Sequence, residues 1–132
     1  RAKEIRNADV SPKPLEITIR PSPNCGAGVV VDVAGFLDAH TVVCFESKMS
    51  AMIDNGVSRV VMNLEGLDYI SSAGIGAIMS IMQKLRCQTG CMVLTQPREK
   101  VYKVLELLGF TKIFPVFGNL DDALAAIQSN AK

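Results

Sequence analysis

Tryptophan is absent from this chain, and aromatic residues of all kinds make up 5% of its 132 residues. Histidine occurs once, so the chain offers a single candidate for a catalytic histidine. The longest apolar runs, such as Val29–Val31, are far shorter than the roughly 20 residues of a membrane-spanning helix. No secretory signal is recognisable either, and we expect no membrane insertion.

An excess of one charge is also missing. Fourteen basic side chains stand against thirteen acidic ones, a formal charge of +1, and the basic residues are scattered along the chain. A nucleic-acid binder would carry a concentrated basic patch. We therefore expect a protein partner and no nucleic acid.

Cysteine is present in small number, at Cys25, Cys44, Cys87 and Cys91. Because 48% of the residues are hydrophobic, the chain can form a core without disulfides, and we interpret the cysteines as free thiols of a cytoplasmic protein. Cys87 and Cys91 could begin a zinc site, but His40 is the single histidine and no second close pair completes a tetrahedral set. No metal or cofactor is expected.

The length is that of one domain with one core. Residues 1–14 mix charges with Pro12 and Pro14 and predict a tail or linker, which leaves the domain over residues 15–132. The first residue is Arg1, so the chain could be part of a longer protein.

Hydrophobic periodicity predicts the secondary structure. Alternation over residues 15–19 is typical of an edge strand, and the apolar run over residues 29–33 suits a strand covered on both faces. A helix over residues 42–53, capped by Asp38, would connect it to a parallel strand over residues 60–64.

The remaining segments continue this alternation. We expect strands at 92–95 and 113–117, and helices at 73–87, 97–108 and from Asn119 onward. The fold class is therefore α/β, with a mixed sheet of about five strands covered by about four helices.

The most informative stretch is Leu64–Gly76, in which Ser71 and Ser72 stand at a strand-to-helix junction. Ligands and partners of open α/β sheets usually bind beyond the carboxyl ends of the strands, where this junction lies. Either hydroxyl could simply cap the helix. A phosphate on either serine would instead meet the positive end of the helix dipole and be tolerated by the fold.

Two catalytic interpretations fit poorly. Ala73–Gly76 lacks the Gly-Lys-Ser/Thr that a P-loop needs to hold phosphates. Neither serine is centred in a Gly-x-Ser-x-Gly nucleophile elbow, and His40 is the one candidate base. We expect no catalytic residues and no enzymatic activity.

The chain resembles the STAS domain, a family of sulphate transporter modules and bacterial anti-sigma factor antagonists. The resemblance covers about residues 15–128. It rests on four motifs, Gly35–Asp38, Asn63–Leu67, Tyr69–Gly76 and Leu107–Phe110.

The resemblance implies a regulatory function. Free-standing members bind a serine kinase that is also an anti-sigma factor, and a PP2C-type phosphatase reverses their phosphorylation. Their acceptor serine follows an aspartate, and the matching positions here are Ser72 for the acceptor and Ser71 for the aspartate. Ser71 is the alternative acceptor. The residues that we expect on the partner-binding face are Asp38, Glu65, Asp68, Tyr69, Ser71, Ser72, Gly74, Ile75 and Gly76.

A second interpretation follows from the same resemblance. Some members of the family act without phosphorylation, as scaffold or sensor subunits of larger signalling or transport complexes. Because Ser71 replaces the aspartate of the motif, this alternative stays open.

Overall fold

A computed structural model describes residues 15–22 and 28–129. The predicted tail or linker over residues 1–14 lies outside the described residues, as does Cys25. Cys44, Cys87 and Cys91 are free thiols. Among the helices of the described ranges, none is long and apolar enough to cross a membrane.

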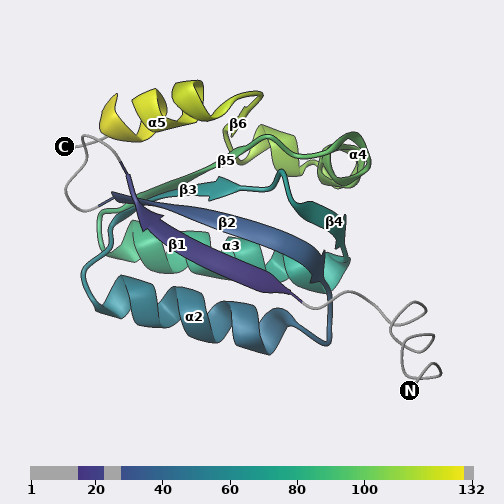
Figure 1. Ribbon diagram of the computed structural model, residues 1–132, viewed down its shortest axis with the longest axis horizontal. Helices are drawn as coiled ribbons and strands as arrows, with labels where there is room; N and C mark the ends of the chain where they lie inside the picture. Colours follow the sequence, from purple (N-terminus) through teal and green to yellow (C-terminus); the bar gives the residue numbers. More distant parts are fainter. Residues whose placement is uncertain (1–14, 23–27, 130–132) are drawn as a thin grey trace, which may run out of the picture.

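The sheet has the order β1-β2-β3-β5-β6, and β4 pairs with β2 outside that path (Figure 1). β1 is antiparallel to β2, whereas every other pairing is parallel. The mixed sheet, the edge position of the first strand and the central position of the second are therefore as predicted. The strands are β1 (Glu16–Pro21), β2 (Gly28–Leu37), β3 (Arg59–Asn63), β4 (Leu67–Ile70), β5 (Cys91–Thr95) and β6 (Val116–Phe117).

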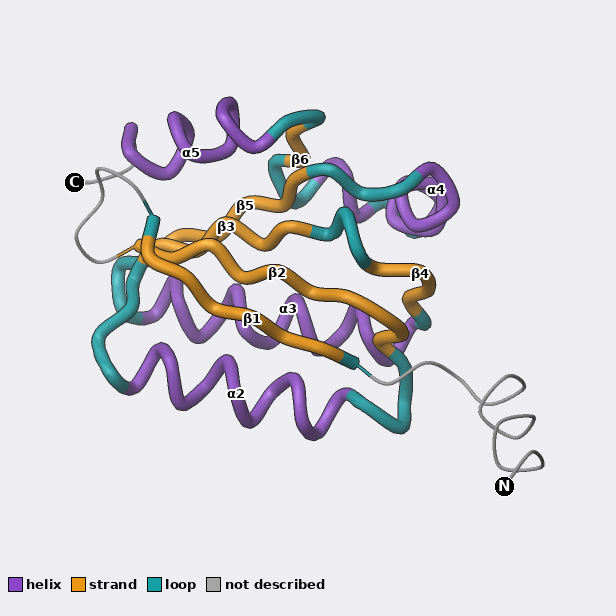
Figure 2. Tube along the Cα trace, viewed as in Figure 1, coloured by secondary structure: helices purple, strands orange, loops and turns teal. Residues whose placement is uncertain are grey.

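Helices cover both faces of this sheet. Figures 1 and 2 show α2 and α3 together on one face, α5 on the opposite face and α4 beside β4. This arrangement confirms the predicted α/β class. The helices are α2 (Val42–Asp54), α3 (Ser72–Cys87), α4 (Glu99–Leu107) and α5 (Leu120–Ser129).

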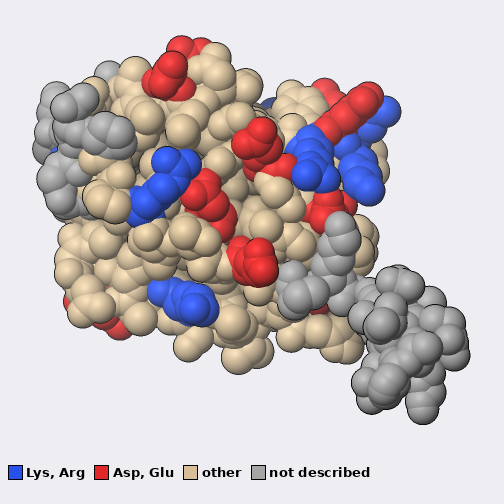
Figure 3. Space-filling model, viewed as in Figure 1, with Lys and Arg blue, Asp and Glu red and all other residues tan. Residues whose placement is uncertain are grey.

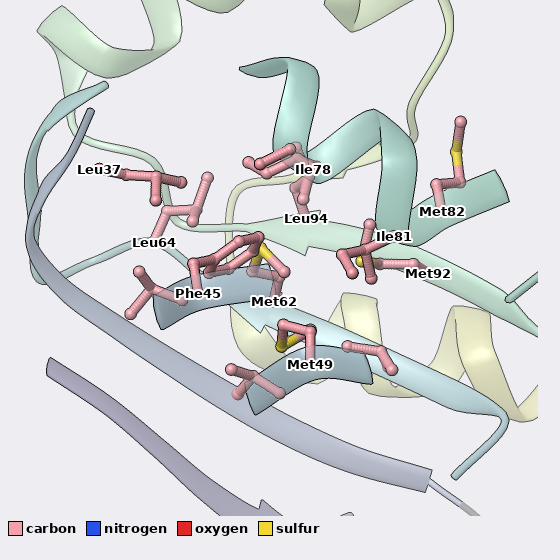
Figure 4. Close-up of a cluster of buried hydrophobic side chains, with 14 of the residues drawn as sticks. Leu37, Phe45, Met49, Met62, Leu64, Ile78, Ile81, Met82, Met92 and Leu94 are labelled. Carbon is pink, nitrogen blue, oxygen red and sulfur yellow. The ribbon is translucent and has the colours of Figure 1, made fainter. Parts of the chain in front are cut away.

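The main core lies between the sheet and the pair α2 and α3. Phe45 and Met49 of α2 meet Ile78 and Ile81 of α3 over the strand residue Met62 (Figure 4). All five are at most 2% exposed. A smaller cluster of Val30, Val61, Val93, Ala123 and Ile127 joins the opposite face to α5. Burial on both faces explains why the central strands are almost continuously apolar.

β4 was not predicted, because no strand was expected between the strand at residues 60–64 and the helix at residues 73–87. β3 pairs with β2 up to Asp32, and β4 pairs with β2 from Gly35 onward. The four residues of β4 therefore continue the line of β3 along the same edge of β2. Gly66 makes this possible, since a Cβ there would lie 2.9 Å from the Cβ of Ala34. Strands this short give almost no periodic signal.

Two further expectations need correction. Asp38 does not cap α2, because Thr41 is the N-cap residue and the Asp38 carboxylate accepts instead from the His40 N–H at 2.9 Å. The strand expected at residues 113–117 is reduced to β6, because a 3₁₀ turn over Phe110–Lys112 precedes it. Pro115 supplies no N–H for a longer ladder.

Candidate functional site

Ser71 connects β4 to α3 and is held by its backbone and side chain together. Its N–H donates to the Leu37 carbonyl at 3.0 Å, which continues the pairing of β4 with β2. Its hydroxyl accepts from the Gly74 N–H at 3.3 Å and so caps the helix. Of the two serines it is Ser71, half-buried, that has the structural role.

Ser72 is the first residue of α3 and is exposed, like Ala73 beside it. The first N–H groups of a helix have no partner inside the helix, and they carry the positive end of its dipole. Ser72 therefore presents a solvent-exposed hydroxyl next to a local positive potential. No basic residue occurs in this first turn, so the helix itself is the source of that potential.

Two expected site residues in the same turn are buried. Gly74 lies against β2, and a Cβ on it would come within 2.7 Å of the Leu37 carbonyl oxygen. Ile75 is 6% exposed and belongs to the main core. These two residues fix the position of α3 beneath the surface, whereas Gly76 is exposed with open space around it.

Tyr69 extends the exposed surface along β4. The residue is 47% exposed, and its ring contacts that of Phe36 of β2, with the ring centroids 5.4 Å apart. Asp38 follows directly after Leu37, the β2 residue that pairs with Ile70. Asp38, Tyr69 and the two serines are thus brought to the same end of β2 and β4.

The pairing of β4 with β2 is irregular at Asp68. Gly35 pairs with Leu67 and Phe36 with Tyr69, so Asp68 is an extra residue in the ladder. Gly35 has φ of 96°, a conformation that glycine accepts readily. Bulges of this kind re-aim side chains and are frequent at functional sites.

Arg98, at the start of α4, holds this bulged region. Its Nε donates to the Glu65 carbonyl oxygen at 2.7 Å, and its Nη1 forms an ion pair with the Asp68 carboxylate. Glu65 and Asp68 are therefore gathered around Arg98 rather than around the serines. Figure 3 shows side chains of both charges close together where α4 lies.

An apolar cleft of about 400 Å³ lies between β4 and α4. Tyr69 and Asp68 form part of its wall, and Lys100 brings a cation to it. The full lining consists of Phe36, Asp68, Tyr69, Ile70, Lys100, Val101 and Val104. The cleft adjoins the exposed ring of Tyr69, so a partner covering that ring could also reach into it.

The sequence pattern did not reveal Arg98, Lys100 or Phe36. A signal was available for the two cations, because Arg98 and Lys100 stand at a helix start, where acidic residues are the favoured choice. A basic residue at a helix N-terminus is unfavourable for the helix itself, so it suggests a contact elsewhere in the fold. Here the reason for Arg98 is a contact with residues 30 and 33 positions away.

The described residues contain no group of three or more His, Cys, Asp or Glu side chains that could hold a metal ion. His40 is exposed in the turn before α2, where its N–H serves Asp38.

The sequence pattern of the STAS domain matches residues 16–123. The chain belongs to the STAS domain family. This STAS domain is 34% identical over 101 residues to BtrV of Bordetella bronchiseptica, a candidate anti-sigma factor antagonist, and the match covers 76% of this chain and 87% of BtrV. It is 35% identical over 82 residues to the anti-sigma F factor antagonist of Lysinibacillus sphaericus, covering 61% of this chain and 70% of that protein.

A solved structure agrees in fold. The STAS domain superimposes on the unphosphorylated anti-sigma factor antagonist SpoIIAA of Bacillus with a TM-score of 0.68 and 25% identity. The match covers 89% of this chain and 96% of SpoIIAA. The predicted family and fold class are both confirmed.

Proposed function

We propose that this chain is an anti-sigma factor antagonist whose binding to an anti-sigma factor serine kinase is controlled by phosphorylation of Ser72. The observation that supports this most directly is the structural difference between the two serines. Ser71 is half-buried and caps α3 with its hydroxyl, whereas Ser72 is exposed on the first turn. A kinase needs an accessible hydroxyl, and Ser72 offers one.

The replacement of the family's aspartate by Ser71 is compatible with this proposal. Aspartate and serine are both favoured N-cap residues, because an oxygen of either side chain accepts from an N–H of the first turn. The exchange therefore keeps the cap that positions Ser72, although it removes one negative charge beside the acceptor.

Phosphorylation would change the surface without unfolding it. A phosphate carries about −1.5 to −2 charges, and at the N-terminus of α3 it meets unpaired N–H groups and the positive end of the dipole. A partner seated on the same surface would have to desolvate or oppose that charge. The modified chain would stay folded and release its partner.

The docking face that we propose consists of exposed and half-exposed parts of two neighbouring clusters. One is the serine end of β2 and β4 with Asp38, Tyr69, Ser71 and Ser72, and the other is the Arg98 cluster with Glu65 and Asp68. Gly76 extends the first cluster along α3, and Gly74 and Ile75 support it from beneath.

The free thiols of Cys44, Cys87 and Cys91 agree with a cytoplasmic setting.

The test is incubation with the cognate kinase and ATP, followed by peptide mass mapping. We expect one phosphate on Ser72, lost in Ser72→Ala and retained in Ser80→Ala, whose serine is also exposed on α3. Incubation with a PP2C-type phosphatase should remove it. Phosphate on Ser71, or on neither serine, would refute this assignment.

A scaffold or sensor subunit that works without phosphorylation is the other outcome of this test. Such a subunit would stay unmodified and would hold its partner equally well as wild type, Ser72→Ala and Ser72→Asp. A pull-down from native cells with these variants distinguishes the two functions.

A further inference from the structure

The outer edge of β1 carries backbone groups that pair with no other strand of the described chain. Ser22, next after β1, donates its N–H to Gly28 at 2.9 Å. Hydrogen-bonded pairs alternate along an antiparallel ladder, so Arg20, Thr18 and Glu16 bond to β2. Ile17 and Ile19 consequently direct their N–H and C=O groups outward.

An apolar groove lies beside this edge on the α2 side. Ile17 and Ile19 stand opposite the core residues Val33 and Val31, and Ile19 is nonetheless 43% exposed. The groove has a volume of about 420 Å³ and is lined by Ile17, Ile19, Lys48, Ala51, Met52, Asn55 and Val57. Natural proteins usually protect such an edge, because it is a template for another strand. Here an apolar stripe occurs together with backbone groups that have no partner strand among the described residues.

We propose that the outer edge of β1 is a homodimer interface, in which two copies pair antiparallel about a two-fold axis at Thr18. The sequence Glu16-Ile17-Thr18-Ile19-Arg20 is complementary to itself in this arrangement. Glu16 lies opposite Arg20 of the second copy, Ile17 opposite Ile19, and Thr18 opposite Thr18. A two-fold interface requires such self-complementarity of one surface patch.

The backbone selects the same register. With the axis at Thr18, the outward N–H and C=O groups of Ile17 meet those of Ile19 in the second copy. An axis at Ile19 would instead place Ile17 opposite Pro21, which has no N–H to donate. The Thr18 register thus satisfies the outward groups of both isoleucines and also places opposite charges face to face.

Arg20 can take part although it already has a partner. Its Nε lies 2.7 Å from Asp32 Oδ2 and its Nη2 lies 3.2 Å from Asp32 Oδ1. A guanidinium has five N–H donors, so Glu16 of the second copy can bind those that remain. Figure 1 shows β1 at the front of the molecule, and Figure 3, from the same side, shows charged side chains of both signs over that region.

A cysteine at the two-fold axis tests the register. Residues facing each other in a non-hydrogen-bonded antiparallel pair have Cα atoms about 4.5 Å apart, within the range of a disulfide. We expect Thr18→Cys to form a covalent dimer under mild oxidation, in a yield well above that of wild type or of Ser80→Cys. A yield no higher than in these two controls overturns the proposal.

Sedimentation velocity tests the interface without cross-linking. Over about a hundredfold range of concentration, wild type should shift from monomer to dimer. Glu16→Lys places like charges opposite each other, and Ile19→Pro removes an outward donor but no bond to β2. Each should raise the dimer dissociation constant about tenfold or more, whereas Glu106→Lys, the same charge change on α4, should leave it unchanged. A wild type that stays monomeric, or a dimer that survives both variants, overturns the proposal.

Discussion

Gly74 and Gly76 are two residues apart in α3, yet their surroundings are opposite. A Cβ on Gly74 would lie 2.7 Å from the Leu37 carbonyl oxygen and 2.9 Å from Leu37 Cγ, whereas a Cβ on Gly76 would meet nothing within 4 Å. The first glycine is needed for the contact between α3 and β2. The second lowers the stability of the helix without a packing reason in this chain.

We therefore predict opposite effects for the same substitution. Gly74→Ala should lower the free energy of unfolding by roughly 1–3 kcal/mol, because backbone of β2 must move. Gly76→Ala should raise it by up to about 1 kcal/mol, the helix preference of alanine over glycine. Denaturant unfolding measures both. A stabilising Gly74→Ala would show that the approach of α3 to β2 is looser than described.

The predicted site residues on α3 differ in exposure: some are buried and others lie on the surface. Ile75 lies in the segment 73–87 that periodicity predicts as a helix and was expected on the partner-binding face, but the structure buries it. The motif resemblance marked whole stretches of sequence, and it therefore could not separate the buried Gly74 from the exposed Ser72. The distinction depends on how α3 rotates onto β2, which the packing around Leu37 decides.

At the scale of the elements, β4 pairs with β2 and also contacts the start of α4. The Arg98 guanidinium binds the Glu65 carbonyl oxygen and the Asp68 carboxylate, so it connects the bulge of β4 to α4. We predict that Arg98→Ala lets β4 open more often, because one side chain provides both contacts. Hydrogen exchange of the Leu67–Ile70 amides should become faster.

Lys103→Ala is the matched control for that measurement. Lys103 also forms an ion pair, with Glu99 at 3.4 Å, but both residues belong to α4 and are exposed. Exchange in β4 should be unchanged in this variant. Equal acceleration by the two substitutions would mean that the ion pairs act only through α4 itself.

A second connection crosses the sheet from its edge. Asp32 accepts from Arg20 of β1 at 2.7 Å and from the Asn63 amide at 2.8 Å, and Asn63 in turn accepts from the Glu65 N–H at 3.2 Å. The hydrogen bond from Arg20 lowers the pKa of Asp32, Asn63 lowers it further, and partial burial opposes both. The network joins β1 to the loop that leads into β4.

The lowered pKa gives a pH dependence of stability with a definite sign. The ionised carboxylate is favoured in the folded state, so its contribution is complete above the unfolded pKa of about 3.9 and is lost as pH falls through the lower folded value. Asp32→Asn should therefore reduce the loss of stability on acidification below about pH 4, compared with wild type and with Asp121→Asn. An identical pH profile in all three chains would contradict this role of Asp32.

The sequence predicted the elements better than the contacts between them. Helical periodicity identified α2 and α3, and continuous apolar runs identified β2 and β3, because the two strands are buried on both faces. β4 was missed because its pairing depends on the small residue Gly66 and on the far end of β2. The partners of Arg98 could not be predicted, because Glu65 and Asp68 lie 33 and 30 positions away, beyond the reach of local patterns.

At the scale of the whole molecule, the two proposals concern different parts of the surface. The serine end of β2 and β4 would bind a kinase, while the outer edge of β1 would bind a second copy. In the strand order β1 lies beyond β2, so a dimer through its outer edge extends the sheet and leaves its pairing with β2 intact. Glu16→Lys should therefore abolish the dimer without changing phosphorylation of Ser72, so the two proposals can be tested independently.

The most direct test of the proposed switch is the affinity of the cognate kinase for the chain with and without phosphate on Ser72. Titration calorimetry should give a dissociation constant at least about tenfold higher for the phosphorylated chain, with a similar increase for Ser72→Asp and none for Ser80→Asp. The charge on the first turn of α3 is the physical reason. Equal affinity of the phosphorylated and unphosphorylated chains would contradict the account.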